Sequence, residues 1–460
     1  MKRILWFRRD LRTEDNPLLS LEGEVLPIFI FDTDILSALR ADDRRITFIY
    51  NALLNLKSSL QKQNLDLAIF YGRPTDIFKW LLSDHHYDEV CASGDYERYA
   101  LERDRDISHL INFNYLHDTY IFRPDEVLKN DGTPYMVFTP FYNRAKALFH
   151  PGHFDEFQPV NQQLMRFDYE HLHCIHDTIH STKATTLESI GFIPQPLTQH
   201  QQRSPEAKLE LFATKIENYS EDRDYMALDG TSGLSIDLRF GTISIRKVIR
   251  WLLTQKKLGK VTEPFFRQLI FRDFYAMLLF HFPHLSERNF RYPFKGIPNQ
   301  TFFKAFCTAQ TGVPIVDAGI RQLLENGDMH NRVRMICASF FTKNLLLPWQ
   351  WGETFFAEHL MDYDASSNIL SWQWSAGTGV DPQPYFRIFN PYTQTSKFDA
   401  NGVYIRQWIP QLASQLPKTF SHEETLSALS LIEYPAPIVN HKNSSKEALA
   451  YFKSFQNNSL

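Results

Sequence analysis

The sequence predicts an α/β domain built on a doubly wound parallel sheet, followed by an all-α domain. In residues 1–128, short apolar runs of strand length alternate with longer amphipathic segments. This alternation is typical of a parallel sheet with helices on both faces. From about residue 201 the amphipathic segments follow one another, separated only by Pro and Gly, which indicates packed helices. We therefore expect domains at 1–128 and 201–460, joined by a connector at 129–200.

The apolar runs of the first domain set the order of its elements. The expected strands are 4–7, 25–31, 67–71 and 89–92, and the expected helices are 44–61, 75–82 and 97 to about 112. No G-x-G-x-x-G sequence follows the first strand, so the usual dinucleotide-binding fingerprint is absent. Arg8 and Arg9 follow it instead, and we interpret both as a solvated or ion-paired strand end.

The rest of the chain comprises a polar connector and a series of expected helices. His, Pro, Gln and Thr are frequent in the connector, and the spacing of its histidines does not suggest a metal site. These histidines are His150, His153, His171, His173, His176, His180 and His200. The helices expected after the connector are 206–219, 243–255, 265–280, 314–326, 329–347 and 352–360. We expect the connector to be a tethered surface segment.

Composition limits the function classes. The net charge of −4 gives no overall attraction to nucleic acid, although 49 Lys and Arg residues leave room for a local basic face. The four cysteines are widely spaced and form no C-x-x-C pair, so we expect neither a bound metal nor a disulfide framework. No apolar run is long enough for a signal peptide or a membrane span. We expect a soluble cytoplasmic protein.

Residues 362–391 have an unusual composition. They read DYDASSNILSWQWSAGTGVDPQPYFRIFNP, in which Asp362, Asp364 and Asn368 interrupt any apolar helical stripe. Buried carboxylates and amides are costly unless they are paired. From this chemistry alone, either a polar ligand or an ion-paired loop over an aromatic core explains the stretch.

Two further segments carry polar groups suited to ligands. Thr231, Ser232 and Ser235 lie in a Gly-flanked turn before a helix, where they either bind a phosphate or cap the helix. In the segment MHNRVRM, Asn331 and Met335 share a helix face at i,i+4. An amide beside a soft apolar group suits the edge and the ring face of a base, whereas a core histidine is the default interpretation of the neighbouring His330.

The chain resembles the DNA photolyase/cryptochrome family, and within it the bacterial class I cyclobutane pyrimidine dimer photolyases most of all. The resemblance rests on WQW, GTGVD and PYFRIFNP within 362–391, on WFRRDLR followed by DN near the N-terminus, and on DGTPYMVFTPF at 131–141. It covers nearly the whole chain. It implies FAD in the all-α domain and an antenna chromophore, methenyltetrahydrofolate or a deazaflavin, in the first domain.

The resemblance also implies which residues contact the flavin. Arg272 matches an arginine that pairs with the first aspartate, here Asp362, and Asn368 matches the residue beside flavin N5. Family members usually carry a basic residue where this chain has Gly233. The implied cofactor-binding residues are Tyr219, Thr231, Ser232, Gly233, Leu234, Ser235, Arg272, Asp362, Asp364 and Asn368.

The same resemblance assigns the DNA and electron-transfer residues. Those implied for damaged DNA are Arg223, Gln268, Phe271, Asn331, Arg332, Met335, Trp374 and Arg387, with Arg334 as a further phosphate contact. Those implied for catalysis are Trp372, Trp349, Asn368, Gln268, Asn331 and Met335. Three positions depart from the dimer-specific pattern: Gln268 replaces Glu, Phe271 replaces Trp, and Phe306 replaces the surface Trp that usually ends the electron-hopping chain.

We interpret the chain as a monomeric photolyase that acts on double-stranded DNA carrying a pyrimidine dimer. Light-excited reduced FAD would donate an electron to the dimer and recover it after ring opening. The alternative within the family is a cryptochrome-like photoreceptor, which Gln268, Phe271 and Phe306 favour and which Asn331, Met335 and Trp374 disfavour. The alternative from another class is a flavin oxidoreductase that works in the dark, and no nicotinamide fingerprint supports it.

Overall fold

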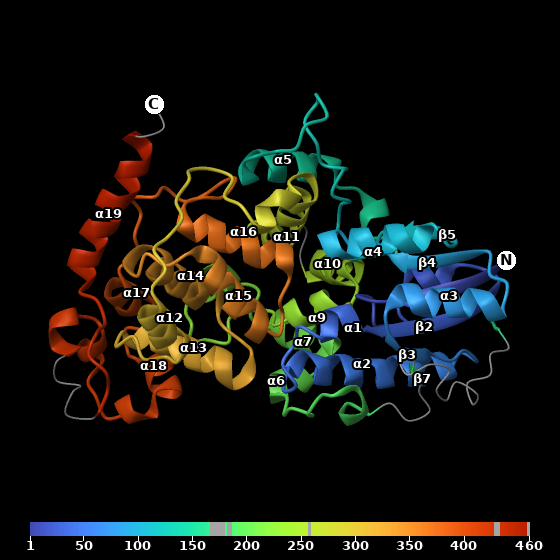
Figure 1. Cartoon of the computed structure of the whole chain (residues 1–460), viewed down its shortest axis with the longest axis horizontal. Helices are drawn as coiled ribbons and strands as arrows, with labels where there is room; N and C mark the ends of the chain where they lie inside the picture. Colours follow the sequence, from blue (N-terminus) through green and yellow to red (C-terminus); the bar gives the residue numbers. More distant parts are fainter. Residues whose placement is uncertain (166–179, 182–185, 256–258, 427–432, 458–460) are drawn as a thin grey trace.

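The sheet and the helices occupy opposite ends of the molecule (Figure 1). The structure is a computed structural model that describes residues 1–165, 180–181, 186–255, 259–426 and 433–457 of the chain. His171, His173 and His176 of the expected connector lie outside the described residues. None of the helices in the described part is long and apolar enough to cross a membrane.

Five parallel strands form the centre of the sheet, in the order β5-β4-β1-β2-β3. They are β1 (Lys2–Phe7), β2 (Glu24–Asp32), β3 (Ala68–Gly72), β4 (Glu89–Ser93) and β5 (Asn112–Leu116). Short β7 (His180–Ser181) is antiparallel to β3, and β6 (Gln163–Leu164) pairs with β2. In β1, Leu5 and Phe7 face one apolar cluster while Ile4 and Trp6 face the other. The sheet is therefore buried on both faces, as the doubly wound prediction requires.

Three helices cover these faces, and one of them corrects the prediction. α2 (Arg44–Gln61) contributes to the first cluster, whereas α3 (Pro74–Asp84) and α4 (Arg98–Ser108) contribute to the second. The helix expected to reach about residue 112 ends at Ser108, because Asn112–Leu116 pairs in parallel with β4 as an edge strand. The sequence of this strand, NFNYL, has asparagine at its first and third positions, so it lacks the continuous apolar run of a central strand.

The second part of the chain is helical, which confirms the predicted fold class. Its helices are α6 (Gln199–Gln202), α7 (Pro205–Ala213), α8 (Tyr219–Asp222), α9 (Ser235–Phe240), α10 (Ile245–Gln255), α11 (Glu263–His281), α12 (Gln300–Cys307), α13 (Pro314–Asn326), α14 (Asn331–Ser339), α15 (Trp349–His359), α16 (Ala365–Ala376), α17 (Pro391–Phe398), α18 (Val403–Trp408) and α19 (His441–Asn457). The helix expected at 206–219 is divided into α7 and α8, and the one at 329–347 ends in a π-helical turn, Phe340–Asn344.

Two short helices lie outside these sets. α1 (Thr33–Leu36) follows β2 directly. α5 (Phe138–Leu148) lies in the segment expected to be an irregular connector, and it packs on α11 through the rings of Phe138, Phe141 and Tyr142. Helix α5 was not predicted from the sequence. Its few apolar residues serve only the contact with α11 and lie inside an otherwise polar segment.

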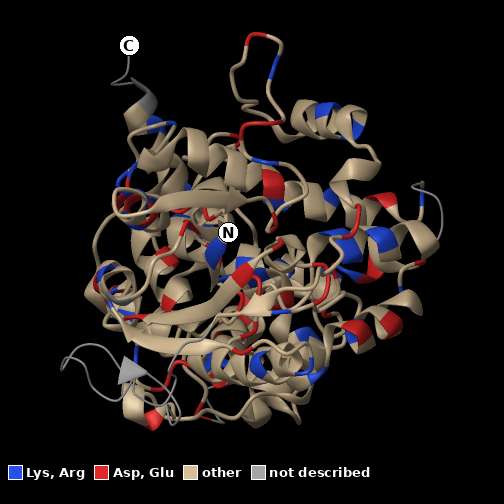
Figure 2. Cartoon of the chain, turned by 90° about the vertical axis from the view of Figure 1, so that its right-hand side faces the viewer, with Lys and Arg blue, Asp and Glu red and all other residues tan. Residues whose placement is uncertain are grey.

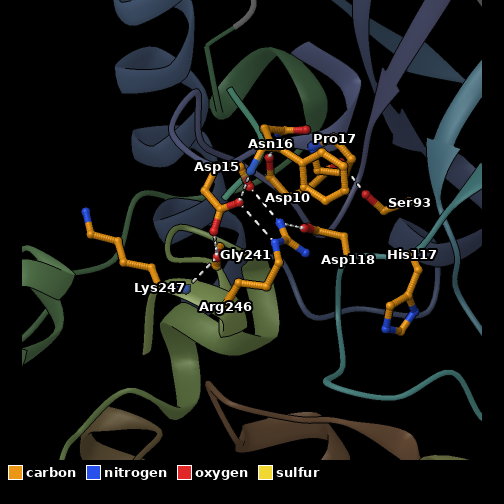
Figure 3. A network of polar contacts seen from close by, with 12 residues as sticks. Asp10, Asp15, Asn16, Pro17, Ser93, His117, Asp118, Gly241, Arg246 and Lys247 are labelled. Atoms are coloured by element: carbon orange, nitrogen blue, oxygen red, sulfur yellow. Dashed lines mark hydrogen bonds and ion pairs between the residues drawn. The ribbon is translucent and has the colours of Figure 1, made fainter. Parts of the chain in front are cut away.

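A buried ion network joins the sheet to the helices (Figure 3). Asp118, which follows β5, accepts hydrogen bonds from Arg12 Nη2 at 2.6 Å and from Arg246 Nη2 of α10 at 2.7 Å. Arg246 Nε also donates to Asp15 Oδ1 at 3.0 Å. All four side chains are at most 6 % exposed. Buried charges must be paired in this way, so the network fixes how the two parts of the chain dock.

The loop after β1 is held against α9 by a second close contact. Gly241, just after α9, has φ +66°, and a Cβ built there would lie 1.9 Å from the carbonyl oxygen of Arg9. The N–H of Leu11 donates to the carbonyl of Phe240 at 3.2 Å. Only glycine allows this approach of the two backbones.

Figure 2 shows Lys and Arg interspersed with Asp and Glu on the side that carries the sheet. Opposite charges mixed in this way give little net field. A nucleic-acid contact is therefore expected elsewhere on the molecule.

We predict that Asp118→Asn lowers the free energy of unfolding by about 3–5 kcal/mol, because two buried guanidinium groups lose their carboxylate. Burial raises the pKa of Asp118, but Arg12 and Arg246 lower it more, to about 2. The carboxylate is thus ionised in the neutral range, and its contribution is lost only as the pH falls from about 4 towards 2. Urea unfolding at pH 7 measures the loss. The control is Asp42→Asn in an exposed pair with Arg40, which we expect to change stability by less than about 1 kcal/mol.

A second buried carboxyl connects α11 to the segment after β5. Asp273 Oδ2 accepts the N–H of Ile121 at 3.1 Å and of Phe122 at 2.9 Å. Its Oδ1 is buried and has no hydrogen-bond partner among the described residues. Burial raises the pKa of Asp273 to about 7, although the backbone N–H groups and Arg272 oppose the change.

We predict that Asp273→Asn becomes more stable relative to the wild type as the pH rises from 5 to 8. The native carboxyl binds its proton more tightly than the unfolded one, so wild-type stability falls as the pH rises through about 7. The difference should be of the order of 2 kcal/mol. Thermal unfolding across this pH range checks it, with the exposed Asp76→Asn on α3 as control. A constant difference between variant and wild type would show that Asp273 does not titrate there.

Candidate functional site

A cavity of about 460 Å³ lies between α11, α14, α15 and α16. Its lining residues are Gln268, Phe271, Tyr275, Asn331, Arg334, Met335, Ala338, Phe356, Leu360, Asp362, Tyr363, Asp364, Ser367, Asn368, Ser371, Trp372, Trp374 and Ser375. Its volume lies within the range of small-molecule sites, about 300–1,000 Å³. Ten residues singled out from the sequence meet here, namely Gln268, Phe271, Asn331, Arg334, Met335, Asp362, Asp364, Asn368, Trp372 and Trp374.

Residues 365–376 of this stretch form the capped helix α16 and supply one wall of the cavity, so they are not the expected loop. The expected ion pairing is present, because Asp362 and Asp364 both contact arginines. Asp364 is the N-cap of α16: its Oδ1 accepts the N–H of Ser367 at 3.1 Å and the hydroxyl of Ser366 at 2.6 Å. Gly377, in the left-handed conformation, ends the helix. The carboxylates thus begin the helix rather than interrupt it.

Asp362 pairs with Arg334 and not with Arg272, which corrects the expected pairing. Arg334 Nη2 donates to both carboxylate oxygens of Asp362, at 3.0 and 2.9 Å. Arg272 instead lies with its guanidinium 5.3 Å from the ring centroid of Tyr120, and its Nη1 is buried without a hydrogen-bond partner among the described residues. Arg334 reaches Asp362 because α14 brings it to the same wall of the cavity. It is therefore a cavity residue rather than a free phosphate contact.

Asp364 faces three arginines. Arg9 Nη2 donates to Asp364 Oδ2 at 2.8 Å, and Arg239 Nη1 lies 3.6 Å from the same oxygen. Burial raises the pKa of Asp364, but Arg9, Arg239 and Arg272 outweigh burial and hold the pKa far below its usual range. Arg9 is thus ion-paired, as expected of the strand end, but its partner in the cavity wall was not foreseen. Arg8 is also paired, with Asp104 at 2.7 Å.

Asn368 is oriented by a residue that the sequence analysis missed. Its Nδ2 donates to the carbonyl oxygen and to Oε1 of Glu353 on α15, at 3.1 and 3.0 Å. Burial raises the pKa of Glu353, and hydrogen bonds from Asn368 and Tyr363 oppose this. With both amide hydrogens directed at Glu353, Oδ1 remains the free polar atom of Asn368. A lone glutamate within the aromatic sequence WQWGETFF was the available signal.

On one face of the cavity, the predicted pair on α14 is confirmed as a pair of neighbours. Asn331 Nδ2 lies 3.6 Å from Met335 Sδ. Phe271 on α11 also lines the cavity. Its ring centroid lies 3.9 Å from that of Phe138 and 5.0 Å from that of Tyr275. The cavity therefore has an amide, a thioether and aromatic rings in one lining.

Comparison with known proteins identifies the family. The family model for DNA photolyase matches residues 3–161, and the model for the FAD binding domain of DNA photolyase matches residues 265–454. A deoxyribodipyrimidine photo-lyase of Synechococcus sp. is 34% identical over 98% of this chain and 96% of its own length. The chain belongs to the DNA photolyase family.

Solved structures of photolyases agree with this assignment. A class III photolyase from Agrobacterium tumefaciens superimposes with a TM-score of 0.86 and 31% identity, over 99% of this chain and 98% of that one. An archaeal photolyase from Sulfolobus tokodaii, solved with two FAD molecules, gives 0.82 and 30% identity over 99% and 100%. The chain is thus an enzyme of a DNA repair family and has an FAD-binding domain.

The cavity fits the flavin part of FAD. Two carboxylates and the amide of Asn368 offer polar partners to a ring with both donors and acceptors, and the apolar and aromatic lining suits its faces. The unpartnered Nη1 of Arg272 adds a buried donor beside Asp364. Asp362, Asp364 and Asn368 would hold the ring.

The turn expected at the pyrophosphate of FAD does not line this cavity. Thr231 and Ser235 are exposed, whereas the side chain of Leu234 belongs to the main apolar core and leaves only its backbone for a ligand. A Cβ on Gly233, which has φ +64°, would lie 2.1 Å from His200 Nε2. The positive φ favours glycine at this position over the basic residue usual in the family. Tyr219, also expected at the cofactor, packs in the same core.

The tryptophans expected to carry electrons are both buried. Trp372 packs between Phe341 and Phe356, with ring centroids 5.4 and 4.9 Å away, and against Gly352, where a Cβ would come within 2.2 Å of its ring. Trp349 Nε1 donates to Asn289 Oδ1 at 2.7 Å. Phe306 is fully buried. The position expected at the surface is therefore a core position, and the electron-transfer role of both tryptophans remains a prediction.

Of the arginines expected at DNA, Arg334 lines the cavity and the other three do not. Arg332 pairs with Asp224 at 2.7 Å and lies 4.4 Å over the ring of Phe398. Arg223 lies 5.6 Å from the ring of Tyr219, and Arg387 is exposed in the loop after α16.

His330 begins α14 as its N-cap. Its Nδ1 accepts the N–H of Arg332 at 3.1 Å, and burial lowers its pKa to about 4. It is thus a neutral structural histidine, close to the default interpretation.

We predict that a double-mutant cycle distinguishes the two possible partners of Asp362. Arg334→Gln and Asp362→Asn, combined, should show a coupling of about 1–3 kcal/mol in the free energy of unfolding, because the two groups share two hydrogen bonds. Arg272→Gln combined with Asp362→Asn should be additive to within about 0.5 kcal/mol. Urea unfolding of the five variants measures both values. Coupling to Arg272 alone would reinstate the expected pair.

Proposed function

We propose that this protein repairs cyclobutane pyrimidine dimers in DNA in a light-driven reaction. The observation that carries the proposal is the joint lining of one cavity. Asp362, Asp364 and Asn368 suit a flavin ring, while Asn331 and Met335 suit a base dimer next to it. Such a site holds an electron donor and its acceptor in contact. The protein then contributes only their positions and the electrostatic environment.

The side chains at the cavity act by binding and orienting the dimer. Asn331 can donate and accept at a base edge, and Gln268 offers a second amide from α11. Met335 and the rings of Phe271 and Trp374 provide apolar faces for the two bases. A dimer is poorly stacked in the duplex, so flipping it into this cavity costs less than flipping an intact pair. When bound at this site in its reduced form, FAD would supply the one-electron chemistry that opens the cyclobutane ring, and the electron would return to it afterwards.

The charged residues hold the cofactor site and the DNA backbone. Arg334 pairs with Asp362 and so gives this carboxyl group a partner of opposite charge inside a largely apolar cavity. Arg387 and Arg223 lie outside the lining, and we expect them to contact phosphates of a duplex bound over the cavity. Because each arginine–phosphate contact releases counterions from the DNA, this local attraction should weaken as the salt concentration rises.

Two residues bear on the rival photoreceptor function. Gln268 cannot supply the carboxylic proton or the negative charge of the glutamate usual in dimer-specific enzymes. Phe271 offers less stacking area than tryptophan. Both retain a hydrogen-bonding group or a ring at the dimer, so we expect repair at reduced efficiency rather than its loss.

We predict light-dependent repair of an oligonucleotide that contains one thymine dimer. The protein is used with its FAD chemically reduced beforehand, so that the result does not depend on the buried tryptophans. Blue light should restore the thymines and darkness should not. Asn331→Ala should lower the rate at least about tenfold, since it removes a hydrogen bond made to the substrate. The control Gln63→Ala, exposed after α2, should match the wild type.

A second variant sharpens the interpretation. Gln268→Glu should raise the rate of repair if the amide limits it. No restoration by a protein that carries reduced FAD would overturn the repair function for this lesion and favour a light sensor.

A further inference from the structure

The crevice where open α/β sheets usually bind ligands is filled here by charged side chains. In the order β5-β4-β1-β2-β3, the chain progresses to one side of β1 and then continues on the other, so the topological switch point lies between β1 and β4. Ligands of such sheets bind outside the carboxyl ends of the strands at this point. Arg9 follows β1, and Asp95 and Glu97 follow β4, at 3.3 and 3.5 Å from Arg9 Nη1.

The second terminal nitrogen of the Arg9 guanidinium makes a contact outside the sheet domain. Nη2 donates at 2.8 Å to Oδ2 of Asp364, which lines the cavity in the helical part. Arg239 of α9 lies between the same carboxylates, 3.0 Å from Glu97 and 3.6 Å from Asp364. Arg9 is only 9 % exposed, so its charge is not screened by water. One guanidinium thus links the switch point of the sheet to the cavity.

The backbone of Arg9 is held too firmly for this contact to be incidental. Asp10 accepts the N–H of Arg8 at 2.7 Å and the hydroxyl of Ser93 at 2.5 Å, as Figure 3 shows for Ser93. Two residues further on, Arg12 enters the buried network around Asp118. The carbonyl of Arg9 rests against Gly241. Arg9 is therefore fixed on both sides with its side chain directed at Asp364.

The two carboxylate oxygens of Asp364 contact different parts of the molecule, one in the helical part and one in the sheet domain. Oδ1 caps α16, whose residues Asn368, Trp372 and Trp374 line the cavity, and Oδ2 faces Arg9. We propose that Arg9 is a positioning residue for the FAD site: it fixes the ionised Asp364 carboxylate, and through it the start of α16, from the sheet domain. The inference rests on the proposed placement of the flavin in this cavity.

The charge of Arg9 has a consequence for the cofactor that packing alone does not have. Without Arg9, the negative charge of Asp364 beside the flavin is less compensated, and a reduced flavin that carries negative charge becomes less favourable. The midpoint potential of the bound FAD then becomes more negative. The affinity for FAD also falls, because the capped end of α16 loses one of its constraints.

The test compares neighbouring arginines of the same loop in the full-length protein. Arg9→Gln removes the charge that reaches the cavity. Arg8→Gln is the matched control, because Arg8 is equally buried but pairs with Asp104 inside the sheet domain. Arg9→Lys keeps the charge but has one nitrogen where Arg9 uses two. The measured quantities are the dissociation constant of FAD from quenching of its fluorescence by apoprotein, the midpoint potential of bound FAD, and the melting temperature.

We expect Arg9→Gln to weaken FAD binding at least tenfold and to make the potential more negative. Arg9→Lys should retain the wild-type potential with an intermediate affinity. Arg8→Gln should lower the melting temperature while FAD affinity stays within twofold of the wild type and the potential is unchanged. Should Arg9→Gln fail to fold, Arg9→Lys against Arg8→Lys gives the same comparison, with weaker FAD binding expected in the first alone.

Two results would overturn the inference. One is wild-type affinity and potential in the Arg9 variants, and the other is an equal loss in the Arg8 and Arg9 variants, which would reflect general destabilisation of the sheet domain. Both readouts are made without DNA. A wild-type protein that binds FAD but repairs no dimer would therefore contradict the proposed repair and leave the role of Arg9 unaffected. Unchanged FAD binding in Arg9→Gln would contradict the role of Arg9 and leave the proposed repair unaffected.

Discussion

Ion pairs buried between the sheet and the helices are the constraint on which the rest of this structure depends. Arg12, Asp118, Arg246 and Asp15 are almost fully enclosed, and each satisfies at least two hydrogen bonds within the set. Removing one member would leave a charge that water cannot reach, so small displacements of either part are penalised steeply. Apolar packing alone tolerates sliding of one surface on another, whereas this network allows one arrangement.

The walls of the functional cavity are also held in place by contacts between distant segments. Its walls are helices, but Asp364 at the beginning of α16 is held by Arg9 from the sheet and by Arg239 from α9. On the opposite side, Phe138 of α5 packs against Phe271. Segments far apart in the chain thus fix both walls, which suits a reaction that depends on placing two groups in contact rather than on proton transfer by the protein.

The departures from the family pattern have physical explanations of different strength. The positive φ of Gly233 favours glycine, and a side chain there would require His200 to move. Phe306 is enclosed by Phe341 and the surrounding core, so this position offers no path to solvent. Phe271 fills its place by stacking on Phe138 and Tyr275. Nothing in the structure explains why glutamine stands at 268.

The sequence by itself determined the fold class, because periodicity reports burial directly. The helices at 44–61 and 314–326 were predicted with their observed bounds, since strong amphipathic patterns begin after Asp43 and at Pro314 and the second ends before Gly327. Resemblance to the family then singled out ten residues that line the cavity. Strand β5 and helix α5 were not predicted. Each has one main neighbour, β4 and α11 respectively, so neither shows a strong apolar pattern.

Only the tertiary structure decided which charges meet. Arg9, Arg239, Arg272 and Arg334 are alike in sequence, and nothing local indicates that Arg334 pairs with Asp362 or that Arg9 reaches Asp364 across 355 positions. Pairing follows from distance and burial, which arise when the sheet docks on the helices. The sequence therefore fixes the kinds of groups available at the site, and the packed fold selects their partners, because in a low-dielectric interior only a contact within a few ångströms can compensate a charge.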